Sequence, residues 1–174
     1  MIILMSGLPG TGKSTLARAL AQRIRGVVLD KDKIRPAIFP AAEVEYSAEQ
    51  DDFCMEVMLQ AAEYLLKRNP QRPVFLDGRT FSRRYQIERV MQRAGALDQD
   101  WRILECVCHD ETARKRLAEG SEHPAGNRDF ALYQQVKARF EAIPFPKAVI
   151  DTDRELPECV AQAYTYIAAG SEQE

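Results

Sequence analysis

Short runs of apolar residues alternate along the chain with longer stretches in which apolar residues recur at helical spacing. Five runs have the length of strands, and they cover residues 2–5, 27–29, 74–76, 103–108 and 148–150. Each run is apolar at nearly every position, which is typical of a parallel sheet covered on both faces. The pattern therefore predicts an α/β fold built on five strands.

Between the runs, apolar residues repeat every three or four positions and predict amphipathic helices. The residues on the apolar faces are Leu16, Leu20 and Ile24; Phe53, Val57, Ala61 and Leu65; Ile87, Val90, Met91 and Ala94; Leu132, Val136, Phe140 and Ile143; and Val160, Ala163, Tyr164 and Ile167. Strands that alternate with helices predict a three-layer α/β/α arrangement. Ligands of such sheets bind beyond the carboxyl ends of the strands, so the candidate chemistry is expected there.

The composition is that of one globular domain, with 174 residues, 45% apolar and 29% charged. A net charge of −2 and a pI of 5.8 argue against a protein whose main partner is nucleic acid. No segment approaches the ~20 apolar residues that span a bilayer, and we expect no leader before the first strand. The four cysteines lack zinc-site spacing, so we expect small buried hydrophobes in a reducing, cytoplasmic protein.

A glycine-rich motif, Gly7-x4-Gly12-Lys13-Ser14, follows the first strand and precedes the first helix. Backbone N–H groups of such a loop, together with the positive end of the helix, favour phosphate. Lys13 supplies a cation for the outer phosphates, and the Ser14 hydroxyl is expected to hold Mg²⁺. The guanine-reading motif Asn-Lys-x-Asp is absent, which favours ATP. The residues predicted to bind the phosphates are Gly7, Pro9, Gly10, Thr11, Gly12, Lys13, Ser14 and Thr15.

The third strand ends in Asp77, at a position where P-loop enzymes place a carboxylate that contacts Mg²⁺. The alternative is that Asp77 caps the next helix, since aspartate favours helix starts. Arg79, Arg83 and Arg84 add positive charge nearby, either for an anionic substrate or as solvated side chains.

The segment after the second strand, Asp30-Lys31-Asp32-Lys33-Ile34-Arg35, resembles the Asp-x-x-Arg element of the polynucleotide-kinase-like family of P-loop kinases. That family includes small-molecule phosphotransferases. The resemblance implies that Asp32 is the general base, that Arg35 binds substrate or phosphate, and that the strands follow the adenylate-kinase-like order 2-3-1-4-5. A carboxylate suits this step chemically, because it can orient and deprotonate an acceptor hydroxyl. Asp30 is the alternative base, and Pro36 disfavours helical backbone at Arg35.

The same resemblance implies a lid over residues 111–128, after the fourth strand. Arg116 matches the first lid arginine of the family. Glu119 and Gly120 stand where a second arginine is usual, so Arg128, beyond an irregular loop, is assigned that role. A lid arginine neutralises charge on the transferred phosphoryl group.

Taken together, these features predict a single P-loop kinase domain over residues 1–174, either monomer or dimer, that uses ATP and Mg²⁺. It is expected to transfer the γ-phosphate to a hydroxyl-bearing acceptor, with a small molecule favoured. A polynucleotide 5′-hydroxyl kinase is the less favoured enzyme, because the chain is short and acidic. An ATP-dependent switch or toxin-like module is the alternative from another class, and it should not need Asp32.

Overall fold

The computed structural model describes residues 1–119 and 129–169. All five predicted strands are present and parallel, in the spatial order β2-β3-β1-β4-β5. Both the α/β class and the predicted strand order are therefore confirmed. The strands are β1 (Ile2–Ser6), β2 (Val27–Asp30), β3 (Val74–Asp77), β4 (Trp101–Val107) and β5 (Ala148–Asp151).

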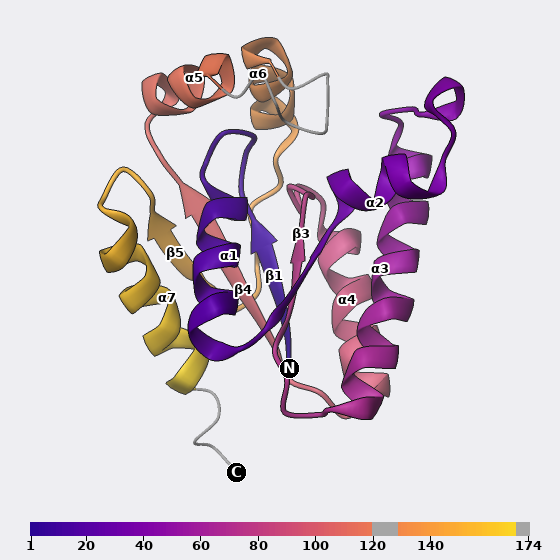
Figure 1. Cartoon of the computed structure of the whole chain (residues 1–174). Coiled ribbons are helices and arrows are strands. Elements are labelled where there is room, and N and C mark those ends of the chain that lie inside the picture. The colour runs from indigo at the N-terminus through magenta and orange to yellow at the C-terminus, as the bar shows by residue number, and fades with distance from the viewer. Residues whose placement is uncertain (120–128, 170–174) are drawn as a thin grey trace.

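Helices cover both faces of the sheet, as Figure 1 shows. On one face lie α1 (Lys13–Ile24) and α7 (Leu156–Ala169), and on the other lie α3 (Ala48–Arg68) and α4 (Arg84–Ala96). Successive residues of β1 point to opposite faces, so Ile2 and Leu4 pack against α3 and α4, while Ile3 and Met5 pack against α1 and α7. This two-sided burial explains why β1 is apolar at each position from Ile2 to Met5.

The remaining helices gather around the carboxyl end of the sheet. They are α2 (Lys31–Ile38), a short 3₁₀ helix (Ala41–Glu43), α5 (Asp110–Glu119) and α6 (Phe130–Arg139). Figure 1 shows α5 and α6 above the loop that joins β1 to α1. Helix α5 falls in the segment expected to form a lid, residues 111–128, whereas α6 follows that segment. Within the described ranges, no helix is long and apolar enough to cross a membrane.

Helix α3 is present, but its predicted apolar face is wrong by one residue. Phe53, in the predicted row, is 55% exposed. Cys54 and Met58, in the row one residue later, are fully buried. The two rows lie side by side on the helix and both are apolar, so the spacing alone does not decide which row packs on the sheet.

Two further predictions from local pattern differ from the structure. Helix α6 ends at Arg139, so Phe140 and Ile143 lie beyond the helix, although both still pack on the core. Helix α2 continues through Pro36, despite the preference of proline for a preceding extended residue. Three side-chain contacts of Arg35, described below, hold this turn of α2 in place.

Candidate functional site

The loop between β1 and α1 adopts a conformation that depends on glycine. Gly7, Gly10 and Gly12 have φ angles of 131°, 79° and 78°, which L-residues with a side chain rarely adopt. A Cβ atom at Gly7 would also lie 2.3 Å from the carbonyl oxygen of Cys106 in β4. The glycine spacing of the motif is thus required by backbone geometry and by close packing on the neighbouring strand.

Lys13 and Ser14 form the first turn of α1 directly after this loop. The ammonium of Lys13 is buried and donates hydrogen bonds to the carbonyl oxygens of Gly7, at 2.8 Å, and Leu8, at 2.7 Å. The first turn of α1 contains no acidic residue, so its positive end remains available to an anion. The loop therefore forms an anion-binding cradle at the carboxyl end of β1.

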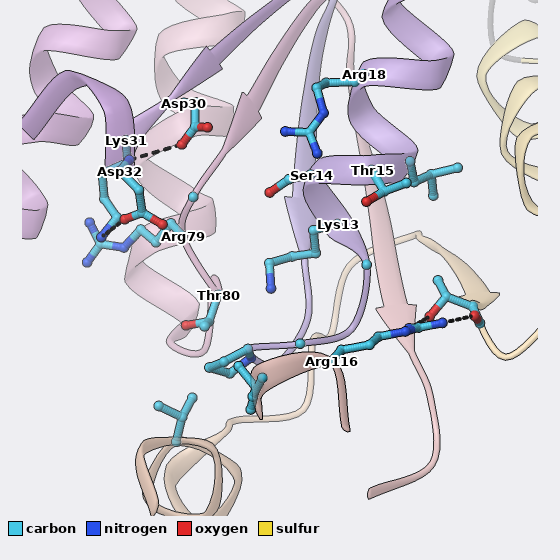
Figure 2. Close-up of a pocket in the computed structure, with 18 of the residues that line it drawn as sticks. Lys13, Ser14, Thr15, Arg18, Asp30, Lys31, Asp32, Arg79, Thr80 and Arg116 are labelled. Atoms are coloured by element: carbon cyan, nitrogen blue, oxygen red, sulfur yellow. Dashed lines mark hydrogen bonds and ion pairs between the residues drawn. The ribbon is translucent and has the colours of Figure 1, made fainter. Parts of the chain in front are cut away.

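A cavity of about 740 Å³ opens beside this cradle. Of the eight residues predicted to bind phosphates, all but Gly7 and Thr11 line it. Thr11 instead donates a hydrogen bond within the loop, to the carbonyl oxygen of Leu8. Figure 2 shows Lys13 and Ser14 on one side of the cavity, and the charged ends of Lys31, Asp32 and Arg79 on the other.

The end of β2 supplies both candidate bases to the cavity. Asp30 caps α2, because its carboxylate accepts a hydrogen bond of 3.0 Å from the backbone N–H of Asp32. Burial raises the pKa of Asp30, and the neighbouring carboxylates of Asp77 and Asp32 raise this pKa further. Asp32 is not engaged as a cap, and its carboxylate lies 3.2 Å from the ammonium of Lys31.

Asp77 ends β3 beside Asp30 and is 1% exposed. Neither of its carboxylate oxygens has a hydrogen-bond partner among the described residues. Helix α4 begins only at Arg84, so Asp77 does not cap it. Asp77 is not among the residues that line the cavity, but buried, unpartnered carboxylate oxygens are ligands of the type that a divalent cation prefers. In the part of the chain that the structure describes, no three His, Cys, Asp or Glu side chains form a group that could hold a metal ion by themselves.

Arg35 lies outside the cavity lining, in contrast to Asp32. Its guanidinium is 2% exposed and donates hydrogen bonds to the Glu45 carbonyl oxygen, to the Gln50 side chain and to Asp51. These contacts join α2 to the start of α3. The geometry therefore favours a positioning function for Arg35, and its direct contact with a substrate remains a prediction.

The arginines after β3 separate into two groups. Arg79 is buried, lines the cavity and forms an ion pair of 2.6 Å with Asp52 of α3. Arg83 and Arg84 are directed away from the cavity and pair with acidic groups, Glu141 and Glu88, on the exposed surface. Of the three, only Arg79 is placed to contact a ligand in the cavity.

Arg116 of α5 reaches across to the loop after β5. Its guanidinium donates to the Thr152 hydroxyl at 3.0 Å and to the Thr152 carbonyl oxygen at 2.7 Å (Figure 2). The Thr152 hydroxyl also lies 3.0 Å from the carbonyl oxygen of Thr11, so this contact links α5, the phosphate loop and β5. Arg128, the second predicted lid arginine, lies outside the described residues.

Helix α5 packs directly on the phosphate loop. A Cβ atom at Gly10 would lie 2.9 Å from the Ala113 carbonyl oxygen and 3.0 Å from the Leu117 side chain. Leu117, together with Leu132 and Val136 of α6, lines the cavity. These helices thus add an apolar cover to a cavity whose other walls are polar.

The four cysteines are free thiols. Cys106 is buried in β4, and burial raises its pKa to about 12. Cys108 lies beyond the end of that strand and is partly exposed. The interpretation of Cys106 as a small core residue is thus supported.

Several lining residues do not stand out in the sequence. Asp51, which lines the cavity, and Asp52, which pairs with Arg79, lie at the start of α3. Acidic residues at a helix start are common because they complement the helix dipole, so Asp51 and Asp52 carry no distinct signal. Thr152 likewise acquires its contacts with Arg116 and Thr11 only through the fold.

A phosphate cradle at the end of β1, in a parallel sheet of this order, defines a P-loop protein of the kinase fold. An AAA domain family model (AAA_33) matches residues 2–143, and the chain belongs to that family. No curated protein matches the chain.

Solved structures share the whole fold at low sequence identity. The APS kinase of Mycobacterium tuberculosis, solved with AMPPNP and APS, is 16% identical with a TM-score of 0.73, over 96% of each chain. A gluconokinase from Sinorhizobium meliloti is 17% identical with a TM-score of 0.68, over 98% of this chain and 93% of that chain. Kti12 of Chaetomium thermophilum, in complex with ADP-AlF3, is 16% identical with a TM-score of 0.64, over 95% of this chain and 98% of that chain. At such identities the likeness shows a shared fold and leaves the reaction open.

Proposed function

We propose that the protein is an ATP-dependent kinase that transfers the γ-phosphate to a hydroxyl group of a small molecule. One observation carries this proposal: the cavity has a second polar wall, with Asp32 and Arg79, opposite the phosphate loop. Transfer to an acceptor needs a group that orients and deprotonates a hydroxyl beside the outer phosphate, and Asp32 on this wall suits that role. Two proteins of the same fold, solved with AMPPNP and with ADP-AlF3, support a nucleotide ligand in this cavity.

On the donor side, the loop amides, Lys13 and the start of α1 bind the phosphates of ATP. Mg²⁺, when bound, neutralises phosphate charge, and Ser14 and Asp77 are the residues that would hold it. Arg116 lies between the phosphate loop and Thr152, where it helps to enclose the nucleotide. Arg128 remains a predicted partner of Arg116 in this enclosure.

On the acceptor side, Asp32 orients the acceptor hydroxyl and takes its proton as the oxygen attacks the γ-phosphorus. Asp32 is favoured over Asp30, because the carboxylate of Asp30 already caps α2. The raised pKa of Asp30 is the observation that keeps it as an alternative base.

The test is to compare Asp32→Asn with Asp30→Asn, using ATP-analogue binding and transfer of labelled phosphate to a mixture of hydroxyl compounds. The mixture contains polyols, hydroxy acids, amino alcohols, nucleosides and a 5′-hydroxyl oligonucleotide. We expect Asp32→Asn to bind the analogue normally and to lose transfer about a hundredfold or more. The exposed residue Asp98 provides the control variant, Asp98→Asn.

Other outcomes assign other functions. Wild-type transfer by Asp32→Asn, together with a loss in Asp30→Asn, makes Asp30 the base. Label on the oligonucleotide alone identifies a polynucleotide kinase. ATP hydrolysis without label on any compound contradicts the kinase proposal and favours a switch module.

A further inference from the structure

We propose that the acceptor is an uncharged polyhydroxyl compound, of the sugar or polyol class, bound on the wall formed by Lys31, Asp32, Tyr46, Asp51 and Arg79. We call this set the acceptor wall. The inference rests on the proposed kinase function and narrows its substrate class.

The buried cations of the acceptor wall are each already paired with carboxylates. The Lys31 ammonium lies 2.6 Å from Asp51 and 3.2 Å from Asp32, and its side chain is 8% exposed. The Arg79 guanidinium lies 2.6 Å from Asp52 and is 5% exposed. Behind the wall, Arg35 also pairs with Asp51. Three buried cations thus face three carboxylates, and the wall has no excess positive charge.

A ligand that carries its own negative charge gains little from such a wall. Its carboxylate or phosphate would compete with Asp51 and Asp52 for cations that those residues already neutralise. Asp30 and Asp77, at the adjacent strand ends, add negative charge on the side of the phosphate loop.

Among the residues that the structure describes, five further cations line the cavity outside the acceptor wall. Lys13 and Arg116 lie on the donor side, whereas Arg18, Lys33 and Arg154 are exposed. Arg18 and Lys33 also line a smaller groove between α1 and α2. Solvent and salt screen the charge of exposed side chains, so the three exposed residues contribute little selectivity for anions.

The hydrogen-bonding groups of the wall match hydroxyl groups. A hydroxyl both donates and accepts hydrogen bonds, and the ion pairs of the wall offer donors and acceptors side by side. The contacts of Arg79 with other described residues are made by Nη2, so Nη1 keeps donor capacity toward a ligand. Neighbouring hydroxyls of one ligand can therefore accept from a cation and donate to a carboxylate without a change in net charge.

Tyr46 completes the wall with an aromatic surface. Its ring lines the cavity and is 43% exposed, and the Arg35 guanidinium carbon lies 5.0 Å from its centroid. An aromatic ring packs well against the C–H faces of a sugar or polyol. The wall thus combines neutral polar pairs with an apolar platform.

The experiment uses matched acceptors that differ only in the charge of one terminal group. D-glucitol, D-gluconate and D-glucamine form one such triad, and equivalent triads with four to seven carbons, together with the parent aldoses, complete the panel. Transfer from γ-labelled ATP is measured with the full chain and Mg²⁺. We expect kcat/KM for an uncharged member to exceed that of its acid by at least about tenfold, which corresponds to ~1.4 kcal/mol.

The outcomes separate this inference from the proposed function. Faster transfer to the acids overturns the inference and leaves the kinase function in place. Label on nucleosides or other hydroxyl compounds, with none on any polyol or aldose, also overturns the inference and leaves the kinase function in place. No label on any class of hydroxyl compound contradicts both.

A charge variant tests the role of the ion pairs. Asp52 does not line the cavity, so Asp52→Asn removes the partner of Arg79 without changing the cavity surface. We therefore expect the ratio of kcat/KM for the acid to kcat/KM for the uncharged acceptor to rise about tenfold. Glu56→Gln is the control, because Glu56 lies one turn further along α3 and pairs with Arg89 and Arg93 outside the cavity. An unchanged ratio in folded Asp52→Asn overturns the electrostatic argument.

A second variant keeps the inference testable if Asp52→Asn does not fold. Tyr46→Leu retains every charge and removes the aromatic surface. We expect the KM for uncharged acceptors to rise about tenfold while the KM for ATP stays unchanged. An unaltered acceptor KM contradicts the proposed platform.

Discussion

The two sides of the cavity are built in different ways. The phosphate loop is one contiguous segment, and its geometry comes from backbone conformation at Gly7, Gly10 and Gly12. The acceptor wall is assembled from the end of β2, the start of α3 and the end of β3, and it depends on side-chain ion pairs between them. One short contiguous motif is sufficient to form the phosphate loop, whereas the acceptor wall exists only in the folded chain.

This difference separates binding of the donor from choice of the acceptor. The loop recognises phosphate, which is common to all nucleoside triphosphates, through amides that every residue carries. The acceptor wall recognises its ligand through charged side chains, such as Lys31 and Arg79, that are paired with carboxylates far along the chain. Substitutions on the two sides should therefore affect different measurements.

The largest expected effect lies on the donor side, with Lys13→Met. Loss of a charge-assisted contact to phosphate should weaken ATP-analogue binding at least about tenfold and phosphoryl transfer at least about a hundredfold. Calorimetric titration and labelled transfer measure the two quantities. Lys67→Met, at an exposed lysine on α3, is the control. Unchanged affinity for the analogue would falsify the assignment of the loop.

The next effect is on stability, with Arg35→Met on the acceptor side. The change removes the hydrogen bonds of a buried guanidinium to Glu45, Gln50 and Asp51, although Asp51 keeps Lys31 as a partner, so the free energy of unfolding should fall by about 2–4 kcal/mol. Urea unfolding measures this loss. Arg89→Met is the matched control, because Arg89 is 43% exposed in its ion pair and should contribute at most about 1 kcal/mol. Wild-type stability combined with lost transfer would instead place Arg35 at the substrate.

A smaller, pH-dependent effect is expected for Asp30→Asn. Because the folded-state pKa of Asp30 is raised, its ionisation destabilises the folded protein. The stability associated with protonated Asp30 is present below the ordinary aspartate pKa and is lost as pH rises through the raised value. Asparagine cannot ionise and still caps a helix, so the variant should be more stable than wild type at neutral pH.

Thermal unfolding of both proteins without nucleotide, from acidic to neutral pH, measures this difference. We expect it to grow with pH and then to level off above the folded-state pKa of Asp30. A difference that shrinks as pH rises contradicts the prediction.

The smallest effect is expected for Phe53→Ser. Phe53 is 55% exposed and contacts Phe39 at a tilted angle, with ring centroids 5.5 Å apart, so the free energy of unfolding should change by less than about 1 kcal/mol. Met58→Ala, on the buried row of the same helix, should cost about 2–5 kcal/mol. Equal losses in urea unfolding would indicate that α3 packs on the sheet through the row that contains Phe53.

Much of the fold is predictable because the sheet is buried on both faces. Continuous apolar strands such as Ile2–Ser6 have few alternatives, and the residues that follow them must lie at one edge. The prediction is weaker where two adjacent rows of a helix are equally apolar, as for the rows of α3 that contain Phe53 and Cys54. It is also weaker where a local preference opposes distant contacts, as at Pro36, where the interactions of Arg35 stabilise the helix.

By itself, the sequence determined the sheet, the phosphate loop and the carboxylates at the strand ends, since periodicity and glycine spacing are local properties of the chain. Only the tertiary structure placed Arg35 outside the cavity, and only it paired Arg79 with Asp52 and Lys31 with Asp51. An ion pair requires two side chains within a few ångströms, and residues far apart along the chain, such as Asp52 and Arg79, meet there only because α3 packs beside β3. The electrostatics of the acceptor wall are therefore a property of the fold.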